Sequence, residues 1–593
     1  MILCLKTIIH KAARLLSRVN LVFLCSFFFI PPQTGIRLQN GAGIPSDASA
    51  FPGLSDNSGI DSGLSFYENH SVLVIVPHED DEICLMGGVF EQFLKHGSTV
   101  RVVFLTNGDF EGPEMGTVRI NEAVRAAAVL GIPESNLIFL GYGDQWANGH
   151  HIYNAAGDEV LLSHCHLTET YGTEAHPAFR SHAPYTRNDL KQDLASVILT
   201  YLPDQIFCID LDGHKDHKAA SLFFEEVMGD LLRESSAYQP AVFKGFGYNT
   251  AWAAPADFYS ENILSTKRPL SLSYSAEIPY YLWHQRIRFP IALSDAARLL
   301  QSAPTFRALR CYESQSADAK AAAVISGDRV FWFRPTTSLL YQAGITASSG
   351  NTDVLHDFKI VDLKEDITER FCFFSGHVWS PLPDDNIRRI SVTLQKPSSI
   401  SELILYDNND PGSNILNMRI VFSDGSKLNT GELNKNGEPT VIRFAEKKGI
   451  TSFTMTITSF EGDQPGLSEI EAYSTAPSAG ISFIKLMNGD EDYMYDYWID
   501  ESGSESVRLY SYPNQVEIVE DNYQFSSSLN PDNVSVRGDE ISISCGKGET
   551  YLLTAVSVRD PKLYDTVRIS NPSPAKRLLA RLLQEKEASR LAG

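Results

Sequence analysis

The feature that most constrains the fold is a short apolar run that ends in a dense group of charges. Residues Val72–Val76 are apolar and mostly β-branched, which predicts a strand buried on both faces, as in a parallel sheet. Pro77 then ends the ladder because it has no N–H to donate. The next residues are His78, Glu79, Asp80, Asp81 and Glu82. A bound dication is the simplest way to offset so many like charges, and the alternative is a solvated acidic turn.

A second apolar run ends in a similar polar group. Residues Gln205–Asp210 predict another buried strand, which is followed by His214, Asp216 and His217. In open α/β sheets, ligand sites form at the carboxyl ends of the strands. Two histidines and a carboxylate, with one position left open, are typical of a catalytic zinc site rather than a structural one. The two groups together predict such a site at one edge of a parallel sheet.

These two groups resemble the paired signatures of the PIG-L/LmbE-type zinc-dependent de-N-acetylases, which are usually (P/A)-H-P-D-D-E and H-x-D-H. The resemblance covers roughly residues 71–346. Glu79 departs from the pattern, because the family usually has proline there; the change removes a rigid φ and adds a carboxylate near the proposed metal. Other similar stretches are R-x-x-E from Arg119, F-L-G-x-x-D at 139–144, R-C-Y-E-S-Q at 310–315 and D-R-V-F-W-F-R at 328–334.

The resemblance implies a role for five residues of the two motifs. His78, Asp81 and His217 would bind Zn²⁺, which would activate water and polarise the amide carbonyl. Asp80 would be the general base and would later protonate the leaving amine. His214 would stabilise the oxyanion. The alternative for Asp80 is a hydrogen bond that only supports the site.

Three further residues are candidates by the same resemblance. Asp216 would orient an imidazole by a hydrogen bond, or it could simply cap a helix. Arg119 and Asp144 would bind substrate hydroxyls, but a buried Arg119–Glu122 pair is an equally good interpretation. The insert 145–187 holds six histidines and is expected to be a substrate lid, with a surface loop or a second metal site as alternatives.

The order of the expected elements predicts the fold class. Strands alternate with helices up to about residue 233, which indicates a doubly wound, Rossmann-like α/β domain with a parallel sheet. Beyond about Gly350, short alternating runs separated by turns indicate all-β sandwich modules. The expected strands are 72–76, 100–105, 136–140, 205–210, 390–394, 402–406, 417–422, 439–444, 452–457, 507–512, 515–519, 541–544 and 552–558, and the expected helices are 84–95, 117–130, 188–201 and 218–233.

The predicted domains follow from these changes of pattern. They are a signal peptide or anchor (1–34), a linker (35–66), the deacetylase domain (67–346), a β-sandwich (355–476), an Ig-like β domain (477–571) and a C-terminal helix (572–593). The sandwich resembles discoidin-like, galactose-binding modules through F-S-D-G-S at 422–426 and G-L-S-E-I-E-A-Y at 466–473. That resemblance implies glycan binding, and a structural role is the alternative. The helix is expected to pack on the last domain.

Charge and the leader limit the possible partners. A net charge of −23 over 593 residues argues against binding nucleic acid or an anionic membrane surface through charge. A basic segment and an apolar run to about Ile30 predict export, with membrane contact only through an uncleaved anchor. The expected location is extracellular, periplasmic or in the cell envelope.

The leading prediction is therefore a zinc hydrolase that removes acetyl from an N-acetylglucosamine-type amino sugar, on an envelope or extracellular glycan. The alternatives are a non-catalytic glycan-binding surface protein and a deacetylase of a small N-acyl amino-sugar conjugate. Since every proposed site residue precedes Lys218, the α/β domain alone is expected to hydrolyse small substrates.

Overall fold

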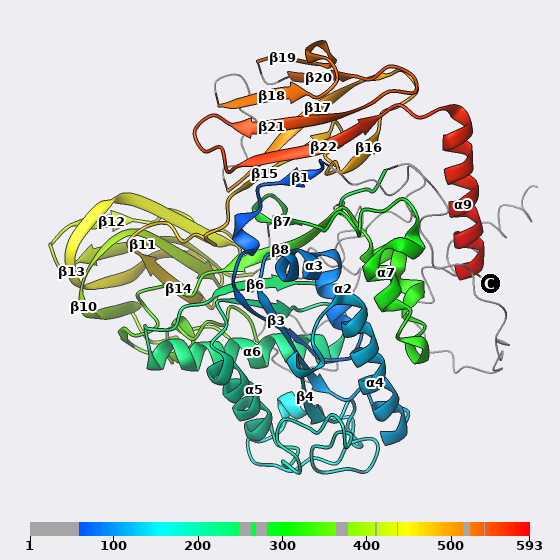
Figure 1. The fold of residues 1–593 in the computed structure, drawn as a ribbon. Helices are drawn as coiled ribbons and strands as arrows, with labels where there is room; N and C mark the ends of the chain where they lie inside the picture. The colour runs from blue at the N-terminus through cyan, green and yellow to red at the C-terminus, as the bar shows by residue number, and fades with distance from the viewer. Residues whose placement is uncertain are drawn as a thin grey trace, which may run out of the picture. The chain divides into compact units, whose positions relative to one another are not determined.

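The computed structural model describes residues 59–247, 262–267, 282–362, 377–409, 412–435, 437–513, 522–538 and 540–592. The predicted leader (1–34) and most of the predicted linker (35–66) lie outside these ranges, as does the expected strand 515–519. Within them, the predicted fold class is confirmed, because an α/β domain is followed by β-sandwiches (Figure 1).

A seven-stranded sheet forms the centre of the α/β domain, in the order β4-β3-β2-β5-β6-β8-β7. The first five strands of this order are parallel, and β8 and β7 add an antiparallel edge that the sequence analysis did not predict. From β2 the chain adds β3 and β4 toward one edge of the sheet, and from β5 it adds β6 toward the other edge. The strand order therefore reverses between β2 and β5, and the carboxyl ends of strands at such a switch point are where these sheets bind ligands. The strands are β2 (Ser71–Val76), β3 (Thr99–Thr106), β4 (Leu137–Tyr142), β5 (Gln205–Ile209), β6 (Ala241–Gly245), β7 (Ile287–Pro290) and β8 (Asp328–Arg334).

Helices cover both faces of this sheet (Figure 1). Right-handed crossovers place α2, α3 and α4 on one face and α5 and α6 on the other. The single helix expected over 84–95 is two helices, separated by a 3₁₀ turn at Gly87–Val89, where Gly87 has a φ of +38°. The helices are α2 (Asp81–Met86), α3 (Phe90–Lys95), α4 (Pro113–Leu130), α5 (Arg187–Tyr201), α6 (Lys215–Glu234), α7 (Pro304–Leu309) and α8 (Ala321–Val324).

The first β domain is one six-stranded antiparallel sheet folded around its own core, which includes the buried Trp379. Four of the expected short strands merge into two long ones, β10 and β13, whose pairing is interrupted by register shifts near Ser398 and Ile400. The pairing of β9 with β10 places the start of this domain before residue 346, the predicted end of the deacetylase domain. The strands are β9 (Gly344–Ala347), β10 (Arg389–Asp407), β11 (Asn414–Phe422), β12 (Lys427–Asn429), β13 (Pro439–Glu461) and β14 (Leu467–Tyr473).

The last β domain is a sandwich of two sheets around a separate buried cluster. Its edge strand β1 comes from the other end of the chain, so the end of the predicted linker is part of this domain. The strands are β1 (Asp61–Ser62), β15 (Phe483–Asn488), β16 (Asp496–Trp498), β17 (Ser504–Tyr512), β18 (Tyr523–Ser527), β19 (Val534–Arg537), β20 (Glu540–Ser544), β21 (Thr550–Ser557) and β22 (Tyr564–Ser570).

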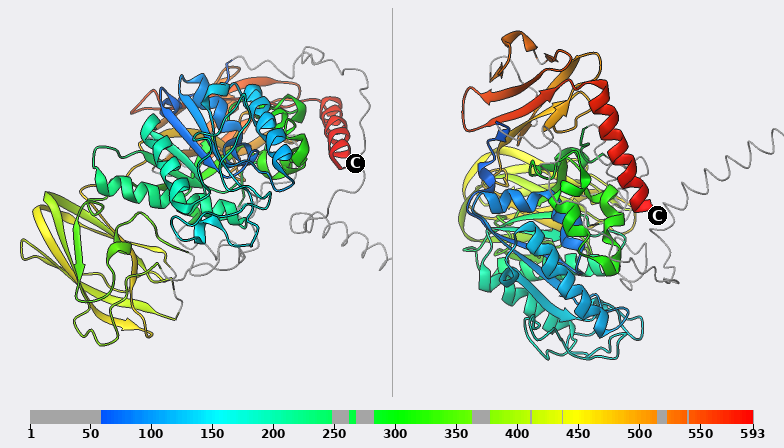
Figure 2. Two further views of the ribbon diagram at one scale, coloured as in Figure 1. Left: turned by 90° about the horizontal axis from the view of Figure 1, so that it is seen from below. Right: turned by 45° about the vertical axis from the view of Figure 1, so that its right-hand side comes forward.

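Both β domains are joined to the α/β domain by buried side-chain contacts. Figure 2 shows the ribbon from two further sides. In the last domain, Phe483 and Tyr495 belong to the same apolar cluster as β2, and the Tyr495 hydroxyl donates to the Gly327 carbonyl at 2.6 Å. In the first, Arg334 of β8 donates to the Glu471 carboxylate at 2.6 Å, and both side chains are buried. The α/β core therefore continues into the β domains.

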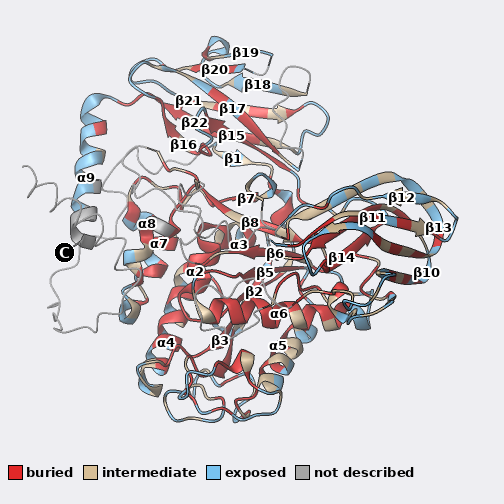
Figure 3. Cartoon of the chain, turned by 180° about the vertical axis from the view of Figure 1, so that it is seen from behind, coloured by how far each residue is buried: buried red, intermediate tan, exposed pale blue. Residues whose placement is uncertain are grey.

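The C-terminal helix α9 (Pro574–Ala592) is largely exposed (Figure 3). Arg577 is buried and donates to the Ile499 carbonyl, whereas Leu578, Leu579 and Leu582 are exposed. The prediction that this helix packs on the last domain is therefore wrong with respect to these three leucines, which do not pack against it. In the described part of the chain, no helix is long and apolar enough to cross a bilayer.

Candidate active site

The loop after β2 turns sharply into α2, and this turn places the first polar group. Asp81 is the first residue of α2, three residues earlier than the sequence predicted the helix. Asp80 precedes it with a φ of +119°, a value that side-chain-bearing residues rarely adopt. Such strain persists only where the surrounding contacts hold it, and it is common at active sites. Asp80 is therefore held in place by its neighbours rather than by its own backbone preference.

The three predicted metal ligands lie together. Asp81 Oδ2 lies 3.0 Å from His78 Nδ1 and 3.1 Å from His217 Nε2, and all three side chains are buried. Ligand atoms of a tetrahedral zinc ion are about 3.3 Å apart, given bonds of about 2.0 Å. Among the described residues, Asp81 Oδ1 is also buried without a hydrogen-bond partner. The donor types and the two spacings from Asp81 Oδ2 therefore suit Zn²⁺. Among the described residues, however, the compact group that contains both His78 and His217 has His214 as its third member and not Asp81.

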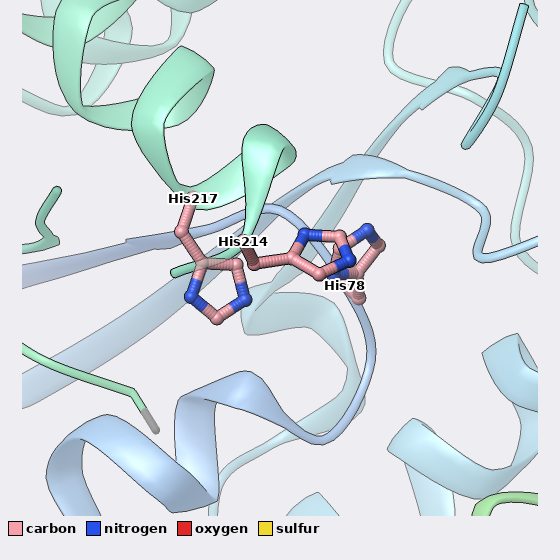
Figure 4. A group of neighbouring side chains, drawn as sticks. All are labelled: His78, His214 and His217. Atoms are coloured by element: carbon pink, nitrogen blue, oxygen red, sulfur yellow. The ribbon is translucent and has the colours of Figure 1, made fainter. Parts of the chain in front are cut away.

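Two other groups of three residues, each offering one ligand atom, share His78. The ring nitrogens of His78, His214 and His217 lie within 4.8 Å of one another, and so do ligand atoms of His78, Asp144 and Asp216. Figure 4 shows the three imidazoles, which come from the loop after β2 and the start of α6. Among the described residues, neither group includes a histidine of the 145–187 insert, so they offer no support for a second metal site there.

Carboxylates contact the two imidazoles that the sequence predicted to bind metal. His217 Nδ1 lies 2.6 Å from Asp212 Oδ2, and His78 Nε2 lies 3.0 Å from Asp144 Oδ1. Such pairs fix the ring tautomer and orientation of metal-binding histidines. Asp212 was not selected from the sequence, although it stands in the same polar run as His217. Asp144, predicted to bind substrate, contacts His78, and its substrate contact stays a prediction.

His214 differs from the other two histidines in its exposure. Its side chain keeps 31% of its accessible surface, against 6% for His78 and none for His217. The backbone N–H of Asp216 donates to His214 Nδ1 at 3.3 Å, which places the proton of the neutral ring on Nε2. Loss of hydration in the site lowers the pKa of His214 to about 4. The ring is thus a neutral donor that a substrate can reach.

Asp216 is contacted by a histidine of the insert. Asp216 Oδ1 lies 2.8 Å from His151 Nε2, while His151 Nδ1 accepts from the Tyr153 N–H at 3.1 Å. The second contact puts the His151 proton on Nε2, so His151 donates to Asp216. Asp216 Oδ2 lies 3.4 Å from His214 and 3.5 Å from His78. Sequence reasoning counted His151 only as one of six histidines, because its neighbours give no sign of this contact.

Arg119 binds the loop rather than Glu122. It donates to the Glu79 carbonyl at 2.7 Å, and its guanidinium lies 3.5 Å from the Glu79 carboxylate and 3.8 Å from Asp80. Glu122 instead accepts from the backbone N–H and the hydroxyl of Ser314, at 2.9 and 2.6 Å. Burial raises the pKa of Glu79 to about 8. Contact of Arg119 with substrate stays a prediction.

Comparisons with known proteins concern separate parts of the chain. Residues 340–473 match a domain of unknown function (DUF7402). No curated protein matches the chain. Similar solved structures include the N,N'-diacetylchitobiose deacetylase of Pyrococcus horikoshii, with 17% identity over 46% of this chain and 86% of that one and a TM-score of 0.25. A deacetylase of the teicoplanin pathway is 13% identical over 44% of this chain and 97% of that one, with a TM-score of 0.25. A family 32 carbohydrate-binding module from C. perfringens NanJ is 15% identical over 23% of this chain and 95% of that one, with a TM-score of 0.18.

The family comparison covers the segment that carries both motifs. Residues 73–228 match the PIG-L family model, described as GlcNAc-PI de-N-acetylase. This segment runs from β2 to α6 and contains every residue predicted to be in the site. The resemblance to the PIG-L de-N-acetylases that the two motifs predicted is thereby confirmed over residues 73–228.

Proposed function

We propose that the protein is a zinc-dependent hydrolase that removes the acetyl group from an N-acetylglucosamine-type amino sugar. The observation that carries this proposal is the position of Asp81 between His78 and His217, at 3.0 and 3.1 Å. The match of residues 73–228 to a family described as GlcNAc-PI de-N-acetylase supports the substrate class. The ion would be held by these three residues and would supply Lewis acidity to water and to the amide carbonyl.

The other residues of the site would supply the proton transfers. Asp80 would accept a proton from the attacking water and then give it to the nitrogen as the C–N bond breaks, which yields acetate and a free amine. His214 would donate from Nε2 to the oxygen that becomes negative when water adds to the carbonyl carbon. Asp212, Asp144 and Asp216 would keep the imidazoles oriented.

The proposed substrate is a glycan of the cell envelope or the extracellular space. Support comes from the sequence, which predicts an exported chain and a β-sandwich of discoidin-like type. A sandwich that binds glycan would raise the local concentration of substrate at the site.

Acetate release is the direct test. The full-length protein is incubated with N-acetylglucosamine oligomers and with envelope glycan, before and after dialysis against a chelator. Release that the chelator abolishes and added zinc restores is expected. Glycan binding without acetate release in the zinc-loaded protein would contradict the proposal and favour a non-catalytic binding protein. Release that persists in a protein shown to be metal-free would remove zinc from the proposal.

A further inference from the structure

A lysine from outside the family match contacts the proposed general base. Lys320 Nζ lies 2.6 Å from Asp80 Oδ2, and the two residues are 240 positions apart in the chain. The Asp80 side chain is almost fully buried, whereas that of Lys320 keeps 32% of its accessible surface. Lys320 ends the 3₁₀ turn η9 (Ala317–Lys320) and lies well beyond residue 228, where the PIG-L match ends.

The segment that carries Lys320 also holds the backbone of Asp80. The Tyr312 hydroxyl donates to the Glu82 carboxylate, which in turn accepts the Asp80 N–H at 3.0 Å. The same segment is fixed to α4, because Ser314 donates to Glu122 and Arg125 donates to the Cys311 carbonyl at 3.2 Å. The 311–320 segment therefore contacts Asp80 directly through Lys320. It also supports Asp80 indirectly, because Tyr312 binds the Glu82 carboxylate that accepts the Asp80 N–H.

These contacts explain how Asp80 keeps its unusual conformation. A φ of +119° is costly for aspartate, and the hydrogen bond to the Asp80 N–H and the ion pair at Oδ2 both act against its relaxation. Lys320 occupies Oδ2, which leaves Oδ1 to face a reacting water. The Arg119 guanidinium lies 3.8 Å from Oδ1.

We propose that Lys320 is a positioning residue for the reaction, which orients the Asp80 carboxylate so that Oδ1 takes the proton from water. The inference rests on the proposed function. It implies that the α/β site is incomplete within residues 73–228 and needs the 311–320 segment.

The test is a double-mutant cycle in the full-length, zinc-loaded protein. Lys320→Met is expected to lower kcat about ten- to a hundred-fold, as misplacement of a catalytic group does, with KM changed less than about three-fold. Lys320→Arg should restore most of kcat, because it keeps the ion pair. Since Lys320 acts through Asp80, the double variant of Lys320→Met with Asp80→Asn should be no slower than Asp80→Asn alone.

Several results would overturn the inference. An unchanged kcat in Lys320→Met, or losses that multiply in the double variant, would show that Lys320 does not act through Asp80. A rise in KM alone would make it a substrate contact. Lys191→Met is the matched control, because Lys191 is similarly exposed and pairs with Asp230 at 2.7 Å. If Lys320→Met does not fold, Lys320→Arg is used in its place. A kcat of Lys320→Arg as low as that of Asp80→Asn would then reject the inference. A wild-type protein that releases no acetate contradicts the proposed function instead.

Discussion

At the scale of single residues, the site combines proposed ligands that lie in two short motifs with supporting residues that lie outside those motifs. His78, Asp80 and Asp81 are set by one turn, so a short motif is enough to predict them. Lys320 has no such pattern, because its contact with Asp80 is made 240 positions along the chain. Asp212 lies only five positions from His217, but the H-x-D-H motif does not include it. This difference is why the proposed ligands could be predicted from the sequence and the residues that hold them could not.

The proposed ligand His217 leads to a prediction about metal content. His217→Ala should lose most of the zinc, because only His78 and Asp81 of the proposed set remain. Asp212→Asn should weaken zinc binding by about 10- to 100-fold, as loss of a carboxylate that orients a ligand histidine does. Elemental analysis and chelator competition measure both effects. Asp193→Asn is a suitable control, since Asp193 is a buried carboxylate that binds Tyr142 instead. Full zinc occupancy in His217→Ala would remove His217 from the ligand set.

Asp80 has a different expected phenotype. Asp80→Asn should keep its zinc and lower turnover by roughly 10²–10⁴, the range for a positioned general base. Asparagine has nearly the same shape but cannot take the proton. Steady-state kinetics and metal analysis on the same preparation check this, with Asp295→Asn as a buried-carboxylate control whose oxygen accepts from Thr305 N–H. Nearly unchanged activity would mean that Asp80 is not the base.

At the scale of elements, four of the five parallel strands and their helices were predicted well, whereas β6 was not predicted and the β domains were predicted less well. Buried apolar runs such as Val72–Val76 have a clear pattern, and β2 differs from the prediction by one residue. In contrast, β10 continues from Arg389 to Asp407 through Lys396–Ser399, a polar stretch that resembles a turn in the sequence. β10 pairs with β13 up to Thr393 and again from Ser398, on both sides of this stretch, and local sequence does not encode that pairing.

The insert 145–187 contacts the proposed site through His151. His151 donates to Asp216 from within the protein, while His164 is exposed and stacks on Phe110. His151→Ala should lower kcat about ten-fold and cost about 1–3 kcal/mol of stability, because it leaves the buried Asp216 oxygen without its donor. His151→Gln should recover part of both, since its amide can donate. His164→Ala is the control from the same insert. Equal effects of the two alanine variants on kcat would contradict a specific role for His151.

At the scale of the whole molecule, the domains depend on one another more than the sequence suggested. All residues of the proposed site precede Lys218 except those of the 311–320 segment. The apolar core of the α/β domain, however, includes Phe483, Tyr493 and Tyr495 of the last domain. The Arg288 guanidinium lies 4.0 Å from the centre of the Tyr493 ring and donates to the Glu491 carbonyl at 2.8 Å. Truncation would expose these apolar groups to water.

This packing changes the expected result of truncation. A chain that ends near residue 346 was expected to hydrolyse small substrates as well as the full protein does. It would also lose β10, the partner of β9, and the Glu471 carboxylate that binds the buried Arg334. Loss of these contacts would add to the apolar surface that truncation exposes, and a large exposed apolar surface favours aggregation. We therefore expect this fragment to be insoluble or inactive even on a small N-acetyl sugar.

A matched truncation tests the same reasoning. Removal of α9 alone, from Pro574, should leave a soluble and fully active protein, because Leu578, Leu579 and Leu582 are exposed. The removal does lose the contact of Arg577 with the Ile499 carbonyl. Solubility, thermal melting and acetate release from small and polymeric substrates are measured for both truncations and the full chain. If the fragment ending near 346 is soluble and as active as the full chain on small substrates, the shared core does not stabilise the α/β domain. A lower rate on polymeric substrate alone would then assign the β domains to substrate targeting.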